Sequence, residues 1–148
     1  MKIEYSPMNK DDSRKVFDMV SSVFDEFVKN DFTDEGVEEF YRALGEFVIS
    51  RPENHDVYAA KSGDEILGMI DIRDNSHISL FFVKSGYHNM GIGKGLMNAI
   101  LPGVKGEILS VNSSLFAVPV YVKLGFRPLK EAQTVNGIKF VPMERPVE

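Results

Sequence analysis

The chain has 148 residues, of which 43% are hydrophobic and 26% are charged, values typical of one globular domain that buries a real core. Its formal net charge of −5 comes without a dense basic cluster, which argues against nucleic-acid binding, and no apolar run reaches the length of a signal-peptide core or a membrane span, so we expect a cytoplasmic protein. The lack of cysteine excludes disulfides and thiolate nucleophiles, and the 3 scattered histidines form no metal-ligand pattern, so we expect no metal.

The first third of the chain predicts a short strand and two amphipathic helices. Residues 2–5 favour the strand, and apolar residues then recur at helical spacing over residues 16–28 and 37–48. Good capping residues precede both stripes, at positions 11–13 for the first and at Thr33 for the second. We expect the two helices to cover one face of a sheet.

From residue 57 onward the hydrophobic pattern changes to the period of β-strands. Residues 57–61 and 65–72 flank Ser62-Gly63-Asp64, which is typical of a hairpin. A turn at Asp74-Asn75 leads into residues 77–83, which are rich enough in β-branched and aromatic side chains to form a buried strand.

A glycine-rich turn follows that strand and opens a helix. The turn holds Gly91, Gly93 and Gly95, and the helical pattern continues until Pro102-Gly103 ends it. This order directs backbone N–H groups and the positive end of a helix dipole at one place, which suits a phosphate group. The alternative is that the glycines only allow a sharp turn.

The last third predicts a strand, a helix and a hairpin, at residues 107–111, 116–124, 127–135 and 138–143. Asn136-Gly137 is the strongest two-residue hairpin signal in the chain. Pro119 indicates either a kink in the last helix or a late start. The elements together predict a single α/β domain over residues 1–148 with a mixed sheet.

Two common phosphate-binding motifs do not fit the glycine-rich turn. A P-loop requires Ser or Thr after its Lys, but Gly95 follows Lys94. A dinucleotide fingerprint reads G-x-G-x-x-G and opens a βαβ unit, whereas the run from Gly91 reads G-x-G-x-G and follows an antiparallel meander. The motif therefore indicates another phosphate ligand.

Together with a second stretch, the turn resembles the GNAT superfamily of acetyl-CoA-dependent N-acetyltransferases. The pyrophosphate loop of that family has Arg or Gln, two further residues, Gly, one residue, and Gly or Ala. Residues 88–93 read HNMGIG, with His88 in place of the Arg or Gln. The later family signature is matched by Asn112, Ala117, Tyr121 and the pair Gly125-Phe126.

The resemblance extends along nearly the whole chain and implies a particular fold and cofactor. The fold is α/β (α+β), with a mixed, mostly antiparallel central sheet of about seven strands and four helices on its two faces. The cofactor is acetyl-CoA, whose pyrophosphate lies on the backbone amides of residues 88–94. The fourth strand diverges from its neighbour, so that the backbone of residues 81–83 pairs with the pantetheine arm and offers an N–H to the thioester oxygen. The predicted cofactor-binding residues are Phe81, Phe82, Val83, His88, Asn89, Met90, Gly91, Ile92, Gly93, Lys94, Gly95, Asn112 and Lys123.

The resemblance also implies the catalytic residues. Tyr121 corresponds to the tyrosine that protonates the leaving thiolate. His77 stands where histone acetyltransferases of the superfamily carry a catalytic glutamate, and a histidine suits a general base because its ordinary pKa lies near the working pH. Asp71 and a water molecule are the other candidates for the base. Since the chain has no cysteine for an acetyl-enzyme intermediate, we expect the amine to attack acetyl-CoA directly in a ternary complex.

The acceptor is predicted only as a primary amine: a small amine, a polyamine, an amino acid or a peptide amine. Acidic residues of the first two helices and their connecting loop could attract a cationic amine, and they are Asp25, Glu26, Asp31, Asp34 and Glu35. A non-catalytic acyl-CoA-binding regulatory module on the same fold is the alternative function. Many relatives pair as dimers, so a homodimer is compatible with the resemblance.

Overall fold

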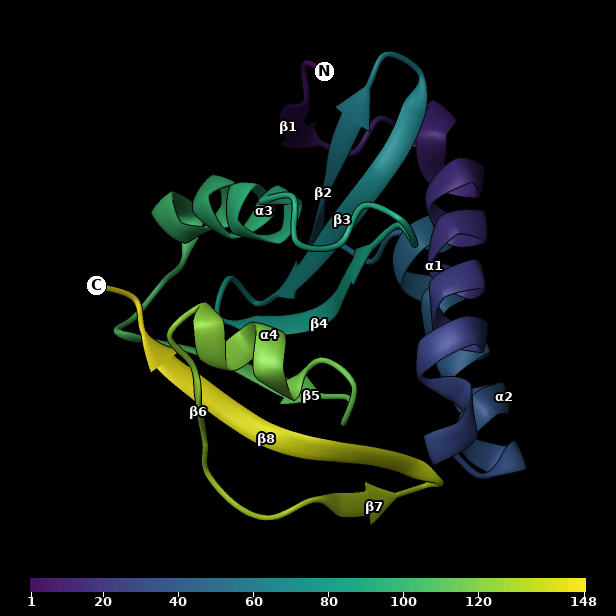
Figure 1. The fold of residues 1–148 in the computed structure, drawn as a ribbon, viewed down its shortest axis with the longest axis vertical. Coiled ribbons are helices and arrows are strands. Elements are labelled where there is room, and N and C mark those ends of the chain that lie inside the picture. The colour runs from purple at the N-terminus through teal and green to yellow at the C-terminus, as the bar shows by residue number, and fades with distance from the viewer.

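A mixed sheet of eight strands runs through the molecule, with helices on both faces, in a computed structural model that describes residues 1–148 (Figure 1). The strands are β1 (Glu4–Pro7), β2 (His55–Ser62), β3 (Glu65–Arg73), β4 (His77–Val83), β5 (Ile108–Ser113), β6 (Arg127–Pro128), β7 (Gln133–Val135) and β8 (Ile138–Pro146). Their order across the sheet is β1-β2-β3-β4-β5-β8-β6, and β7 pairs with β8 outside this path. The predicted fold class is confirmed.

Four α-helices form the two outer layers: α1 (Ser13–Phe27), α2 (Asp34–Leu44), α3 (Ile92–Ile100) and α4 (Val118–Lys123). The chain continues from α2 into a π-helical turn, η3 (Gly45–Ser50). Short 3₁₀ turns, η1 (Lys10–Asp12), η2 (Lys29–Asp31) and η4 (Leu101–Gly103), connect other elements. None of the helices has both the length and the apolar character needed to cross a membrane.

Alternating side chains of the strands supply two separate cores. On one face, Met69 and Leu80 pack with the apolar stripe of α1 and with Leu44 and Val48. On the other face, Ile70 packs with residues of α3 and α4. Figure 1 accordingly shows α1 and α2 together on one side of the sheet and α3 on the opposite side.

The sheet opens between β4 and β5, its only parallel pair. These strands pair at two positions alone, His77 with Ser110 and Ile78 with Val111, and then diverge (Figure 1). Ser79 is the extra residue of a β-bulge, because Ile78 pairs with Ile72 whereas Leu80 pairs with Asp71. The outer edge of β4 after the bulge therefore has no strand partner.

Local signals predict most caps, turns and strands correctly, with two exceptions. Thr33 caps α2 by accepting the Gly36 N–H at 3.2 Å, and α4 begins late, with Pro119 in its first turn. Asp12 makes no side-chain cap for α1, and its carboxylate instead binds Lys61 at 2.6 Å. The predicted continuous strand 127–135 is also wrong, since only β6 and β7 form at its two ends.

The start of α2 packs closely against the β7–β8 turn. Asn136 and Gly137 have φ values of 53° and 80°, as a tight hairpin turn requires. The Gly137 carbonyl accepts the Thr33 N–H at 3.1 Å. A Cβ atom on Gly36 would lie 2.1 Å from that same carbonyl oxygen. Gly36 thus allows the hairpin to dock on α2.

Replacing Gly36 with Ala should lower the free energy of unfolding by about 1–3 kcal/mol, because two backbones must separate to admit the methyl group. Alanine's higher helix propensity, worth about 1 kcal/mol, offsets only part of this cost. Gly45→Ala is the matched control, since its Cβ would lie 4.0 Å from the nearest atom, in Phe17. Urea unfolding should show opposite signs for the two variants, and equal effects would contradict the docking role of Gly36.

Candidate active site

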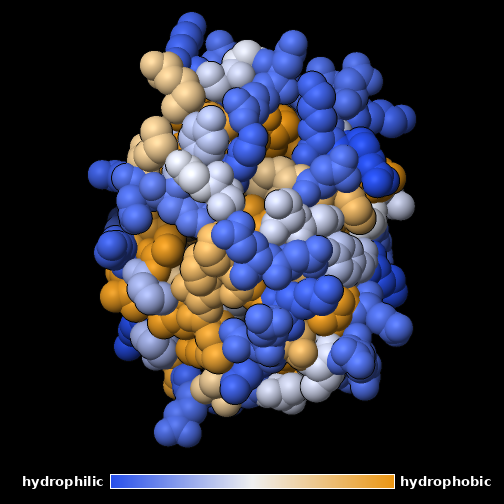
Figure 2. All heavy atoms as spheres, turned by 45° about the vertical axis from the view of Figure 1, so that its right-hand side comes forward, coloured by the Kyte–Doolittle hydropathy of each residue, from blue (hydrophilic) through white to orange (hydrophobic).

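A cavity of about 730 Å³ lies where β4 and β5 diverge. It extends from the α1–α2 layer, past both strands, to the first turn of α3 and to α4. Figure 2 brings the α1–α2 side of the molecule forward, and there hydrophobic atoms reach the surface at the lower left, bounded by hydrophilic side chains. The opening of the sheet thus joins the two faces of the molecule in one cavity.

Most of the residues predicted to bind a cofactor line this cavity: Phe81, Phe82, Val83, His88, Asn89, Gly91, Ile92, Gly93, Lys94, Asn112 and Lys123. Met90 and Gly95 are absent from the lining. Met90 is 52% exposed on the surface. A Cβ atom on Gly95 would lie 2.2 Å from the Tyr5 ring, so Gly95 serves the packing of β1 against α3.

The first turn of α3 presents unpaired backbone N–H groups to the cavity. Gly91 is the N-cap residue, has φ 81°, and provides no side-chain cap. Asn89, two residues earlier, is also in the left-handed region, with φ 63°. Because the first N–H groups of a helix carry partial positive charge, this end of the cavity favours an anion.

The free edge of β4 offers the backbone groups of alternate residues. Lys84 donates its N–H to the Leu67 carbonyl of β3 at 2.8 Å. Since successive residues direct their backbone groups to opposite edges, those of Phe82 also face β3, whereas those of Phe81 and Val83 face the cavity. Phe82 therefore lines the cavity through its side chain.

His88 turns its side chain toward this edge. Its Nε2 lies 2.8 Å from the Val83 carbonyl oxygen. Its ring lies 5.4 Å from that of Phe27 of α1 and 6.1 Å from that of Phe116, which precedes α4. Phe27 and Phe116 stack at 4.6 Å. An aromatic cluster thus connects the two layers beside the glycine-rich turn. His88 also forms a hydrogen bond with the Val83 carbonyl, which the resemblance assigns to pantetheine.

Tyr121 lies in the lining of the cavity on α4. Its ring packs against Phe81 and Phe126, with centroids 5.7 and 5.2 Å apart. Burial raises the pKa of Tyr121 above its ordinary value because the phenolate would lose its hydration. The phenol therefore remains protonated throughout the neutral range.

His77 lines the cavity at the start of β4, and its Nδ1 lies 2.8 Å from the Ser110 hydroxyl. Burial lowers its pKa to about 4, and the charge of Arg73 acts in the same direction. The imidazole is consequently neutral at pH 7, and its pKa lies well below the near-neutral value that the sequence predicts. It can accept a proton only from a nitrogen that is already acidic.

Asp71 lies outside the cavity lining, and its partner His55 stacks on Phe47 of η3. Its carboxylate is fully buried and bonds to Nδ1 of His55 at 2.7 Å. Burial raises the pKa of Asp71 to about 6, against the lowering effect of His55. Asp71 is therefore a buried partner of His55 and is not placed to meet an acceptor.

Other lining residues have no signal in the sequence. The bulge residue Ser79 lines the cavity, and its buried hydroxyl has no hydrogen-bond partner. Arg73 lines the cavity from the end of β3. Phe40, Phe47 and Phe140 line it as well, although their spacing only predicts core positions.

The fold is that of an acetyltransferase, and a family model assigns the chain to the same class of protein. The family model described as the acetyltransferase (GNAT) domain matches residues 28–146, and the chain belongs to this family. No curated relative matches the chain by sequence.

Solved structures share the fold at low sequence identity. A GCN5-related N-acetyltransferase from Rhodopseudomonas palustris is 14% identical, with a TM-score of 0.79 and coverage of 99% of this chain and 96% of that chain. The PaiA N-acetyltransferase from Thermoplasma acidophilum, in complex with coenzyme A, is 18% identical, with a TM-score of 0.73 and coverage of 99% of both chains. An aminoglycoside 6'-N-acetyltransferase complexed with coenzyme A is 16% identical, with a TM-score of 0.70 and coverage of 100% and 98%.

Proposed function

We propose that the protein transfers the acetyl group of acetyl-CoA directly to a primary amine. One observation carries the proposal: a single cavity contains the first turn of α3, the free edge of β4 and Tyr121. Two similar structures are described as complexes with coenzyme A, which supports the same ligand here.

Each part of the cavity fits one part of acetyl-CoA. The N–H groups from Asn89 to Lys94 suit the pyrophosphate, because they lie at a helix N-terminus. The edge groups of Phe81 and Val83 suit the amides of pantetheine, as an added strand would, once His88 releases the Val83 carbonyl. An N–H of this edge is also suited to stabilise negative charge on the thioester oxygen.

Tyr121 and His77 account for the two proton transfers. The attacking amine forms a C–N bond as the C–S bond breaks, and its nitrogen then becomes more acidic than the free ammonium group. His77 is neutral and suited to accept that proton, which passes on to solvent. The Tyr121 hydroxyl donates its own proton to the departing sulfur and is reprotonated from solvent.

Thermal unfolding with and without acetyl-CoA tests the proposal. At 100 times the dissociation constant, a ligand stabilises the folded state by about 2.7 kcal/mol, which corresponds to a Tm increase of roughly 5–10 °C for a chain of this size. S-acetylpantetheine, which lacks the pyrophosphate, should raise Tm less. Released coenzyme A thiol is then measured with a panel of amines.

Two outcomes separate the alternatives. No change in Tm at millimolar acetyl-CoA would sink the proposal. A clear increase in Tm with no thiol release for any amine would support the non-catalytic acyl-CoA-binding module instead.

A further inference from the structure

The charged side chains that line the cavity are all basic. They are Arg73, Lys94 and Lys123, and no Asp or Glu is among the lining residues. His77 adds no charge to the cavity, because its imidazole is neutral at pH 7. Lys94 and Lys123 are predicted to bind acetyl-CoA, whose phosphates offset their charge, so Arg73 is the cation that remains on the acceptor side and repels a second ammonium group.

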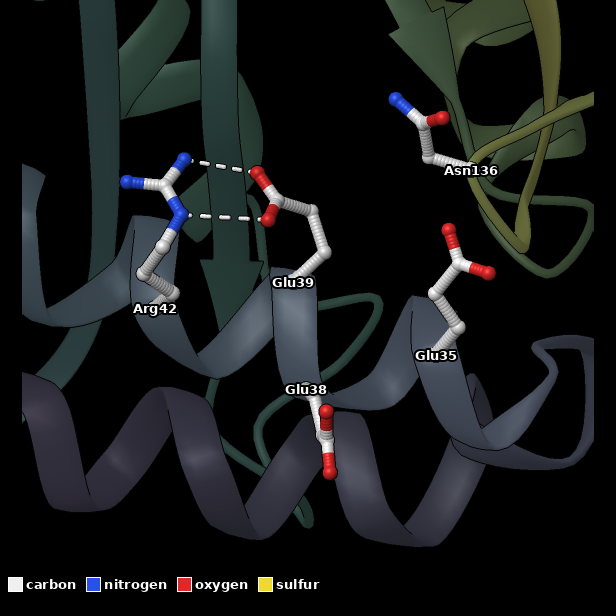
Figure 3. A pocket seen from close by; sticks show the side chains of 5 residues that line it. All are labelled: Glu35, Glu38, Glu39, Arg42 and Asn136. Carbon is white, nitrogen blue, oxygen red and sulfur yellow. Dashed lines mark hydrogen bonds and ion pairs between the residues drawn. The ribbon is translucent and has the colours of Figure 1, made fainter.

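The acidic residues of the first two helices lie outside this cavity. Asp25 accepts a hydrogen bond from the Tyr41 hydroxyl at 2.6 Å. Glu35 lines a separate surface depression between α2 and the β7–β8 turn, where Asn136 faces it and Arg42 pairs with Glu39 (Figure 3). These carboxylates are not placed to bind an amine inside the cavity.

The α1–α2 side of the cavity is instead aromatic. Its wall consists of Phe32, Phe40, Ala43, Phe47, Ile138 and Phe140. Two of the rings are held by stacking: Phe40 lies 3.8 Å from Phe24, and Phe47 lies 4.0 Å from the His55 ring. The rings of this wall are only half-buried, so an apolar ligand gains by covering them.

Polar partners on this side suffice for one amine. The Ser79 hydroxyl is buried without a partner, and the side chains of His77 and Asn112 line the same region. We infer that the acceptor is a monoamine with an aromatic or branched apolar body, whose nitrogen binds at Ser79 and His77. This inference rests on the proposed function and names the substrate class of that site.

Such a body occurs both in simple arylalkylamines and in hydrophobic amino acids. Arg73 distinguishes the two sources, because it lines the cavity beside His77, its cross-strand partner. Its own ion pair with Asp74 is long, at 3.6 Å, so the guanidinium is available to a carboxylate. Arg73→Gln should lower kcat/KM for phenylalanine and spare phenethylamine if an amino acid is the natural acceptor.

A matched pair of amines tests the inference in the 148-residue chain. 4-Methylbenzylamine and p-xylylenediamine share one ring and differ in a methyl group against a second aminomethyl group. With acetyl-CoA saturating, kcat/KM should be at least about 10-fold higher for the monoamine, the scale of discrimination that an apolar pocket provides. Spermidine should be a poorer acceptor still.

Phe140→Glu should lower that monoamine-to-diamine ratio by about 10-fold or more, because it places a carboxylate in the wall. Lys139→Glu is the control: it adds a carboxylate at the neighbouring residue, whose side chain alternates to the other face of β8, and should leave the ratio within about twofold. If Phe140→Glu does not fold, Phe140→Ala should lower kcat/KM for the monoamine by about 10-fold while the acetyl-CoA melting shift is retained.

A diamine or spermidine that is acetylated faster than the monoamine would overturn the inference and leave the proposed function intact. Where neither amine releases thiol, their binding to the coenzyme A-loaded protein is titrated by NMR, and tighter binding of the diamine, or no binding of the monoamine, overturns it as well. If acetyl-CoA does not raise the Tm, the proposed function itself fails, and this result is distinct from a failure of the inference about the acceptor.

Discussion

Tyr121→Phe should lower kcat by about 10²- to 10⁴-fold, the usual contribution of a positioned general acid. The hydroxyl belongs to a residue of the cavity lining, and the ring is held by Phe81 and Phe126. Because the variant keeps the ring, its affinity for acetyl-CoA should stay within about twofold of wild type. Burial keeps the phenol protonated, so the wild-type rate should show no alkaline loss attributable to Tyr121 near neutral pH.

The matched control is Tyr58→Phe. Tyr58 is a half-buried tyrosine that packs against the same core but does not line the cavity. It should retain kcat, and both variants should unfold at similar urea concentrations. A Tyr121→Phe protein that turns over at the wild-type rate, in an assay where the wild type is active, would remove Tyr121 from the mechanism.

The part of the cavity that we propose binds the cofactor is predictable from sequence because its determinants are local. Gly91 and Gly93 are close in the chain, and the loop geometry follows from the left-handed backbone of Gly91, with φ 81°, and from the helix that begins after it. The Asn112 to Phe126 signature likewise belongs to one strand and the helix after it. Such short-range patterns can be recognised in a single sequence, and Gly91, Gly93, Asn112, Ala117 and Tyr121 all line one cavity.

The part that we propose binds the acceptor depends on pairings between distant segments. Ser79 gains its position from a bulge, which arises from the register of β4 against β3 and leaves no trace in composition. Phe40 and Phe47 belong to an apolar stripe whose period predicts burial but not which rings remain half-buried at its margin. The position of the His88 side chain depends on Val83, Phe27 and Phe116, which come from three separate segments of the chain.

The pKa of His77 illustrates the same limit. Its residue type alone suggests a base that titrates near pH 6.5. Burial and the neighbouring Arg73 lower that pKa to about 4, and both effects come from the fold. The role that we propose for His77 is therefore to accept a proton from a nitrogen that is already bonding to carbon, and not to abstract one from free ammonium.

Gly93→Glu should weaken acetyl-CoA binding by about 100-fold or more while the folded protein stays as stable as wild type. Gly93 lies in the first turn of α3 and lines the cavity. The nearest atom to an added Cβ is 3.4 Å away on the Phe81 ring, an ordinary contact distance, so the backbone at this position admits a Cβ atom. A carboxylate about 5 Å from a phosphate charge is repelled by roughly 3 kcal/mol at an effective dielectric constant of 20.

The same carboxylate should not harm the helix. Glutamate has a higher helix propensity than glycine, and a negative charge in the first turn interacts favourably with the helix dipole. The stability of Gly93→Glu should therefore equal or exceed that of wild type, whereas its affinity for acetyl-CoA falls. This opposition separates a lost ligand site from a damaged fold.

Asn98→Glu provides the control, because it places a carboxylate at an exposed position of the same helix, outside the cavity. Isothermal titration should find near wild-type affinity for this variant, and the loss with Gly93→Glu should be smaller for S-acetylpantetheine, which has no pyrophosphate to repel. Equal losses for both ligands would mean that the glutamate blocks the β4 edge by its bulk. Unchanged affinity for acetyl-CoA would place the pyrophosphate away from α3, and the assignment of the glycine-rich turn as its binding site would then fail.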